Sequence, residues 1–139
     1  MSKRKRLPAT CLAIIVCEGV VEDARSHNKC ILNLFNVIWS ESVPVAHDRL
    51  TVFLALTDVH GELPLRLTFG LHGQEPVFDF KGKVKTGSPR DVADLVLDMR
   101  QVPIPAFGEY AVNVEVAGEM VGTRRVLVRQ AKMPGRKAE

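Results

Sequence analysis

The chain of 139 residues is long enough to bury a core of its own, so it needs neither a disulfide framework nor a structural metal to fold. Apolar residues make up 46% of it and charged residues 25%, which is ordinary globular composition and excludes disorder of the whole chain. The net charge of +3 comes from basic ends, because residues 7–128 carry more acidic than basic side chains. Residues 7–128 therefore lack the broad basic face of a dedicated nucleic-acid-binding protein.

The two ends of the chain differ in composition from its middle. Residues 1–9 contain an unbroken basic run, and residues 131–139 are again basic and polar. We therefore predict flexible tails at 1–9 and 131–139 around a single domain at 10–130. The apolar run at 12–17 is shorter than the apolar region of a signal peptide, and no run is long enough to cross a membrane. These features predict a cytoplasmic protein without a membrane span.

The dominant hydrophobic period is two residues, which is typical of strands with one wet face in an antiparallel sheet. Turn residues interrupt the pattern at short intervals, and no long helical pattern occurs. We predict an all-β, antiparallel two-sheet sandwich, immunoglobulin-like, with about eight strands. The strands are expected near residues 10–18, 29–39, 49–57, 63–71, 76–85, 92–99, 109–117 and 120–129.

The first two predicted strands are apolar on both faces. A strand of this kind must be covered twice, and a two-layer sandwich supplies only one cover. The second cover is expected from a loop, from the chain's own ends or from another protein. We therefore predict an interface for a homo-oligomer or another protein, formed by residues from both strands: Ile14, Val16, Leu32, Leu34, Phe35 and Trp39.

Two later segments allow more specific expectations. Lys81, Lys83 and Lys85 form a basic row on one face of a strand, where lysines at a sheet edge discourage aggregation. Residues 88–99 are ambiguous, because Ser88 and Pro89 make a good helix start while the residues that follow also alternate as a strand. We favour the strand, with Leu95, Leu97 and Met99 among the inward-facing residues.

A proline-rich corner precedes the seventh strand. Pro103 and Pro105 are followed by Gly108 and Tyr110, and then by alternating valines. This order is similar to the tyrosine corner of immunoglobulin-like sandwiches, in which the tyrosine hydroxyl bonds to backbone a few residues upstream. We therefore predict that Gly108 and Tyr110 form a structural corner.

Sets of residues that would carry catalysis or bind a metal are weak in this sequence. The three cysteines, Cys11, Cys17 and Cys30, are odd in number and contain no C-x-x-C pair, which favours buried thiols in a reducing compartment. Asp58 and His60 are read as ordinary turn residues, since no second ligand cluster accompanies them. We assign no catalytic residue, no cofactor and no metal site.

Several segments together resemble an uncharacterised family of small bacterial sandwich proteins. They are residues 17–20 (Cys-Glu-Gly-Val), the polar loop after them, residues 31–39, 44–47 and 50–56, and the Gly-Glu pairs at 108–109 and 118–119. The resemblance spans about residues 12–129. It implies a sandwich of immunoglobulin type and no catalytic residue. The family pattern has Gly near Asn33 and Asp near Asn36, so this chain differs at both positions.

Three functions follow from these expectations. The first is a non-catalytic protein-interaction or assembly module that uses the apolar N-terminal strands. The second is a small-ligand-binding or enzymatic domain with a loop-borne polar site that includes His47, Asp58 and His60. The third is weak binding of nucleic acid or another anionic surface by the basic tails, which would depend steeply on salt.

Overall fold

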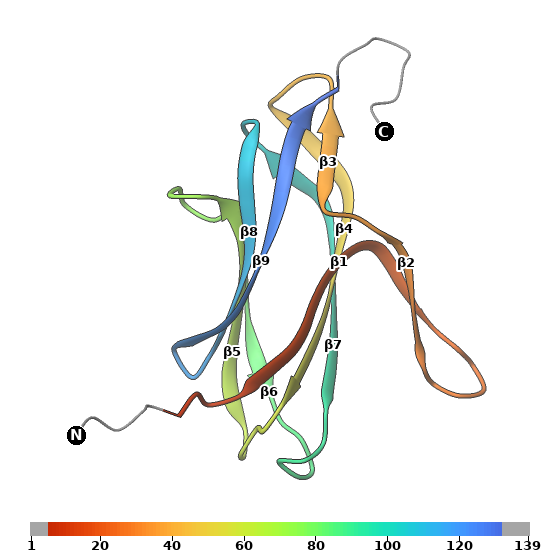
Figure 1. The fold of residues 1–139 in the computed structure, drawn as a ribbon, viewed down its shortest axis with the longest axis vertical. Coiled ribbons are helices and arrows are strands. Elements are labelled where there is room, and N and C mark those ends of the chain that lie inside the picture. The colour runs from red at the N-terminus through yellow and green to blue at the C-terminus, as the bar shows by residue number, and fades with distance from the viewer. Residues whose placement is uncertain (1–5, 132–139) are drawn as a thin grey trace.

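The computed structural model describes residues 6–131, and within them the chain forms nine strands in two sheets (Figure 1). The prediction of an all-β, two-sheet architecture is confirmed. The strands are β1 (Thr10–Glu22), β2 (Lys29–Leu34), β3 (Val37–Ser40), β4 (Val45–Thr57), β5 (Leu63–Leu71), β6 (Phe78–Val84), β7 (Ala93–Ile104), β8 (Gly108–Val116) and β9 (Glu119–Gln130).

The two sheets differ in size and in the direction of their strands. One sheet has the order β2-β1-β4-β7 and is antiparallel throughout, while the other has the order β3-β9-β8-β5-β6. In the second sheet, β3 runs parallel to β9, pairing Val37 with Leu127 and Ser40 with Gln130. The expectation of a purely antiparallel sandwich is therefore wrong, although most pairs are antiparallel.

The predicted strand at 29–39 is in fact two strands that belong to different sheets. Asn33 has a φ of 52°, a left-handed conformation that Asn tolerates better than most residues do. Next to this kink the Phe35 amide donates to the Val16 carbonyl at 3.0 Å, and the Leu127 amide then donates to the Asn36 carbonyl at 3.0 Å. The chain thus leaves β1 and joins β9 within a few residues, which is why the strand count rises to nine.

The core lies between the sheets and is lined by alternate residues of the long strands. On β4 and β5 the inward side chains are fully buried, among them Leu54 and Leu67.

The segment after Ser88 makes only one turn, closed by the hydrogen bond from the Asp91 amide to the Ser88 carbonyl, and then becomes β7. The strand interpretation of 92–99 is therefore confirmed. The core also includes Ala9, one residue before the predicted start of the domain. Residues 1–5 and 132–139 of the predicted tails lie outside the described residues.

The corner between β7 and β8 is held by one buried phenol. The Tyr110 hydroxyl donates to the Ala106 carbonyl at 2.6 Å and accepts from the Ala106 amide at 3.2 Å. Its ring is fully buried and stacks on Phe69, with centroids 5.4 Å apart. Gly108 begins β8 with a φ of 140°, a conformation that side chains rarely adopt. One side chain thus ties the strand crossing to the core.

The edge strands of the two sheets differ in the charged side chains that protect them against pairing with another sheet. β6 is an edge strand of the five-stranded sheet, and Lys81 and Lys83 are exposed on it, a placement that discourages edge-to-edge pairing. β7, at the edge of the other sheet, exposes Asp94, Asp98 and Arg100. From residue 30 to residue 40, by contrast, the edges formed by β2 and β3 carry no charged side chain. The side of the sandwich formed by β2 and β3 is therefore the one without charged protection.

Candidate functional site

The N-terminal hairpin extends beyond the sandwich as a two-stranded ribbon. β1 pairs with β4 only as far as Cys17, and from there to Glu22 it pairs with β2 alone (Figure 1). We refer to residues 18–34 as the ribbon. A two-stranded ribbon is marginally stable by itself and depends on what it packs against. None of the six β2 residues is buried: Lys29 and Ile31 are partly exposed, and the other four, which include Leu32 and Leu34, are exposed.

The residues predicted for the interface separate into three groups. Leu32, Leu34 and Trp39 are exposed by 45%, 53% and 44%. Phe35 is half-buried against the core. Ile14 and Val16 face the core and are buried, so they are not accessible to a partner. The prediction placed them on the wrong face, because a strand that is apolar on both sides does not reveal which side faces the companion sheet.

Sequence reasoning also missed several residues of the outer face of the four-stranded sheet. Ile15, Phe53 and Val96 occupy directly paired positions on β1, β4 and β7 and form an apolar row across that face. Val21 pairs with Cys30 on the ribbon, and both are exposed. The alternation in β1 contained this signal, since Ile15 stands between the two residues that were chosen.

A charged network interrupts this apolar face. Arg49 donates two hydrogen bonds of 3.1 Å to the Asp98 carboxylate, and Arg100 and the Thr51 hydroxyl also donate to it. The bonds from Arg49, followed by those from Arg100 and Thr51, lower the pKa of Asp98 to about 2 against partial burial, which raises it. The Arg49 guanidinium also lies over Gly19, where an added Cβ would be 3.3 Å away. The network therefore anchors the base of the ribbon to β4 and β7.

We expect Asp98→Asn to lower the free energy of unfolding near neutral pH by about 1 kcal/mol, after discounting for solvent screening. Because the folded pKa of Asp98 is about 2 and its ordinary value is 3.8, the contribution is full above the ordinary value and is lost as pH falls towards 2. Urea unfolding at several pH values tests this, with Asp94→Asn as a control for charge on the same strand. Equal losses in both variants at every pH would contradict the assignment.

The three cysteines lie in different environments. Cys17 is fully buried, and burial raises the pKa of its thiol, as expected of an inert thiol. Cys11 is half-buried, and burial raises its pKa as well. Cys30 is exposed on the ribbon, so the prediction of a buried thiol is wrong there. All three are free thiols.

The polar residues considered for a loop-borne site do not all come together. Asp58 and His60 line a hollow of about 410 Å³ beside Thr10, whose hydroxyl donates to Asp58 at 2.6 Å. His47 lies elsewhere, with its ring centroid 5.8 Å from that of Phe35. Burial lowers the pKa of His47, and its Nε2 atom is buried without a hydrogen-bond partner among the described residues. Within residues 6–131, no group of three or more His, Cys, Asp or Glu could hold a metal ion.

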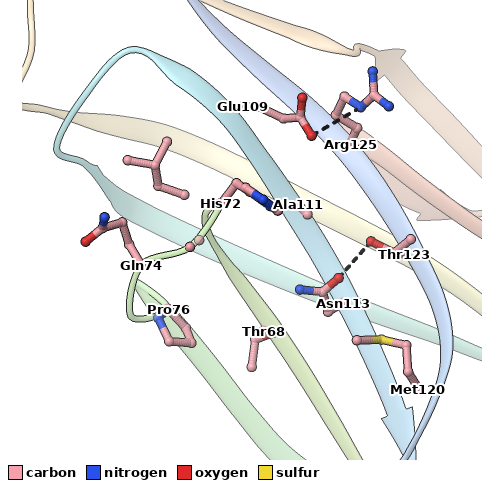
Figure 2. Close-up of a pocket in the computed structure, with 13 residues that line it drawn as sticks. Thr68, His72, Gln74, Pro76, Glu109, Ala111, Asn113, Met120, Thr123 and Arg125 are labelled. Atoms are coloured by element: carbon pink, nitrogen blue, oxygen red, sulfur yellow. Dashed lines mark hydrogen bonds and ion pairs between the residues drawn. The ribbon is translucent and has the colours of Figure 1, made fainter.

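A second candidate site is a cleft of about 570 Å³ on the outer face of the five-stranded sheet (Figure 2). Its lining comes from β5, β8, β9 and the loop after β5. Two interactions join β8 to β9 in this lining. Glu109 forms an ion pair with Arg125 at 3.5 Å, and the Thr123 hydroxyl donates a hydrogen bond to the Asn113 side-chain oxygen at 2.7 Å. Sequence reasoning missed this cleft.

Among the described residues, no helix is long and apolar enough to cross a membrane. No curated protein has a significant sequence match to the chain. Among solved structures, the chain is similar to the alkylpurine DNA glycosylase AlkC of Pseudomonas fluorescens, bound to DNA containing an abasic site analog. The two share 13% sequence identity with a TM-score of 0.52, over 88% of this chain and 31% of the glycosylase. The chain thus spans about a third of the glycosylase, and the likeness concerns the fold alone.

The sequence also matches a family model over nearly the whole sandwich. The match covers residues 12–129, from the third residue of β1 to the last residue but one of β9. It is the range over which the sequence resembled an uncharacterised family of small sandwich proteins. The chain belongs to the family of unknown function DUF6941.

Proposed function

We propose that the protein is a non-catalytic interaction module that binds another protein chain through the ribbon. The observation that carries the proposal is that the ribbon carries apolar side chains on both of its faces and lies outside the core. On one face Val21, Leu32 and Leu34 are exposed, and on the other Val20 and Ile31 are only half-buried. None of these five side chains belongs to the core cluster of the sandwich.

The energetics favour a partner over an exposed ribbon. Full burial of one Leu or Val side chain stabilises by roughly 1.5–3 kcal/mol, and the exposed half of each would contribute about half of that. Leu32, Leu34 and Trp39 follow one another along the unprotected edges of β2 and β3. Aromatic side chains are frequent among the residues that dominate binding energy. Trp39 is therefore the expected anchor at the rim of this surface.

We also propose that the sandwich is of the immunoglobulin type and functions in a reducing compartment such as the cytoplasm. The hydrogen bonds between Tyr110 and Ala106 support the first statement, since they have the form of a tyrosine corner. The three free thiols support the second, because an exposed thiol such as Cys30 persists best where disulfides do not form.

Site-specific photo-crosslinking tests the interaction. With a photoreactive amino acid at Leu34 in the native host, we expect crosslinks to protein that are absent when the same amino acid replaces Lys83 on β6. Repeating both reactions with the purified chain separates a second copy from another protein. Leu32→Glu in the Leu34 variant should abolish the crosslink because it places a charge in the apolar surface. No crosslink at Leu34 above the Lys83 level would overturn the proposal.

A further inference from the structure

The cleft in Figure 2 exists because two small residues meet in the middle of an exposed sheet face. Gly70 of β5 pairs directly with Ala111 of β8, and both residues line the cleft on the outer face of the sheet. Larger side chains stand around them, so the sheet surface is hollowed at this pair. An added Cβ on Gly70 would lie 2.9 Å from the Pro76 Cα, so the loop after β5 lies directly over this strand. The hollow is therefore built by the fold.

The loop that forms one wall of the cleft is held by backbone hydrogen bonds. The Gln74 amide donates to the Leu71 carbonyl at 3.0 Å, and the Val77 amide donates to the Phe69 carbonyl at 2.8 Å. The His72 amide donates across to the Glu109 carbonyl at 2.9 Å. A ligand would thus meet a wall that is already ordered, which lowers the entropic cost of binding.

Several polar groups around the cleft lack partners. Thr68 is only 8% exposed, and its hydroxyl has no hydrogen-bond partner among residues 6–131 although the residue lines the cleft. Beside it, Asn113 uses its side-chain oxygen for Thr123, which leaves its amide nitrogen unpaired within the described chain. Among the described residues only His47 Nε2 is a fully buried side-chain polar atom without a partner, so the two groups in the cleft stay open to water or to a ligand. Thr68 and Asn113 therefore offer adjacent hydrogen-bonding groups to a molecule in the cleft.

The charges at the rim restrict the class of ligand. Glu109 and Arg125 are the charged pair on this cleft, and their separation of 3.5 Å leaves hydrogen-bonding capacity on both. A carboxylate or phosphate would be repelled by Glu109, and an ammonium group by Arg125. A hydroxyl group can donate to the first and accept from the second. Met120, half of which is exposed, and Pro76 add apolar surface at the sides.

We propose that this cleft binds a small, neutral, polyhydroxylated molecule, in other words a saccharide. Its hydroxyls satisfy Thr68 and Asn113 on the floor and bridge Glu109 and Arg125 at the rim, while its carbon face packs on Met120. The cleft lies on the sheet opposite the one that carries the ribbon, so this inference does not depend on the proposed interface.

Amide chemical shifts of the isotopically labelled full-length chain test the inference. The probes are D-glucose, D-galactose and N-acetyl-D-glucosamine, with acetate and methylammonium as small charged comparisons. We expect at least one sugar to shift the amides of Thr68, His72 and Asn113 saturably, and neither charged probe to do so. If no sugar shifts these amides, or if only a charged probe does, the inference is overturned.

Two variants connect binding to the cleft. Ala111→Leu fills the hollow and should abolish the sugar-dependent shifts. Thr68→Val removes one hydroxyl at nearly constant shape and should weaken binding about fivefold, which corresponds to one neutral hydrogen bond. Thr10→Val removes a hydroxyl outside the cleft and should leave affinity unchanged. Unchanged binding by a folded Ala111→Leu variant would also overturn the inference.

Discussion

Tyr110→Phe is expected to lower the free energy of unfolding by about 2 kcal/mol while the fold is kept. The phenylalanine ring preserves the stacking on Phe69, so the variant removes only the hydroxyl that donates to the Ala106 carbonyl and accepts from its amide. Both backbone groups of Ala106 then lose this partner at a half-buried corner. Denaturant unfolding measures the loss as a lower midpoint at an unchanged slope.

Thr123→Val is the matched control for this experiment. It also removes one hydroxyl that donates a hydrogen bond, in this case to Asn113 on the exposed sheet face. Because water can replace an exposed partner, we expect a change within about 0.5 kcal/mol. If both variants lost the same free energy of unfolding, the Tyr110 hydroxyl would stabilise the fold no more than one ordinary exposed hydrogen bond does.

The pH dependence of the same residue gives an independent check. Burial raises the pKa of the Tyr110 hydroxyl from its ordinary value of 10.0, against a smaller lowering by the hydrogen bond to Ala106. Its contribution to stability is therefore full below pH 10 and is lost as pH rises further. Since Tyr110 is the only tyrosine, phenolate absorbance reports on it alone and should appear late in the folded protein.

Local periodicity predicted the inside and outside of most strands. Tyr110 and the alternating valines after it face the core as the pattern indicates, and Leu97 and Met99 do so on β7. Periodicity failed where both faces are apolar. In β1 it could not tell whether Val16 or Ile15 faces the companion sheet, because that depends on the pairing with β4, which is not local.

The break between β2 and β3 was also beyond the local pattern. Nothing in the apolar alternation from residue 31 to residue 38 marks a change of sheet. The signal was Asn33, since Asn is one of the few residues that tolerate the left-handed backbone found there. Asn36 then accepts a hydrogen bond of 2.6 Å from Arg124, far along the chain. The parallel pairing of β3 with β9 thus depends on a contact that sequence separation conceals.

The cleft shows a similar limit. Its floor requires that Gly70 stand beside Ala111, and this register joins two strands that are distant in sequence. A glycine within a strand is a known sign of close backbone approach, so Gly70 was the available clue. The polar groups around it looked like ordinary residues of a wet sheet face. Only the register shows that several of them surround one hollow.

Gly70→Ala is expected to lower the free energy of unfolding by about 1–3 kcal/mol, the usual range for overpacking. The direction of this change is informative, because replacing a strand glycine by alanine ordinarily raises the free energy of unfolding where the backbone conformation permits alanine. Here the new Cβ would lie 2.9 Å from the Pro76 Cα and 3.4 Å from the Glu75 carbonyl oxygen. Both are backbone atoms, so the whole loop must move rather than one flexible side chain.

Gly87→Ala is the matched control, because the only atom near its added Cβ is the Asp91 side-chain oxygen at 3.3 Å. We expect it to change stability by less than about 0.5 kcal/mol. Hydrogen exchange at the Val77 amide, which donates to the Phe69 carbonyl beneath the loop, should accelerate in Gly70→Ala only. A stable Gly70→Ala variant with a protected Val77 amide would mean that the methyl group fits without displacing the loop. The close approach of Pro76 to Gly70 would then not be what shapes this wall of the cleft.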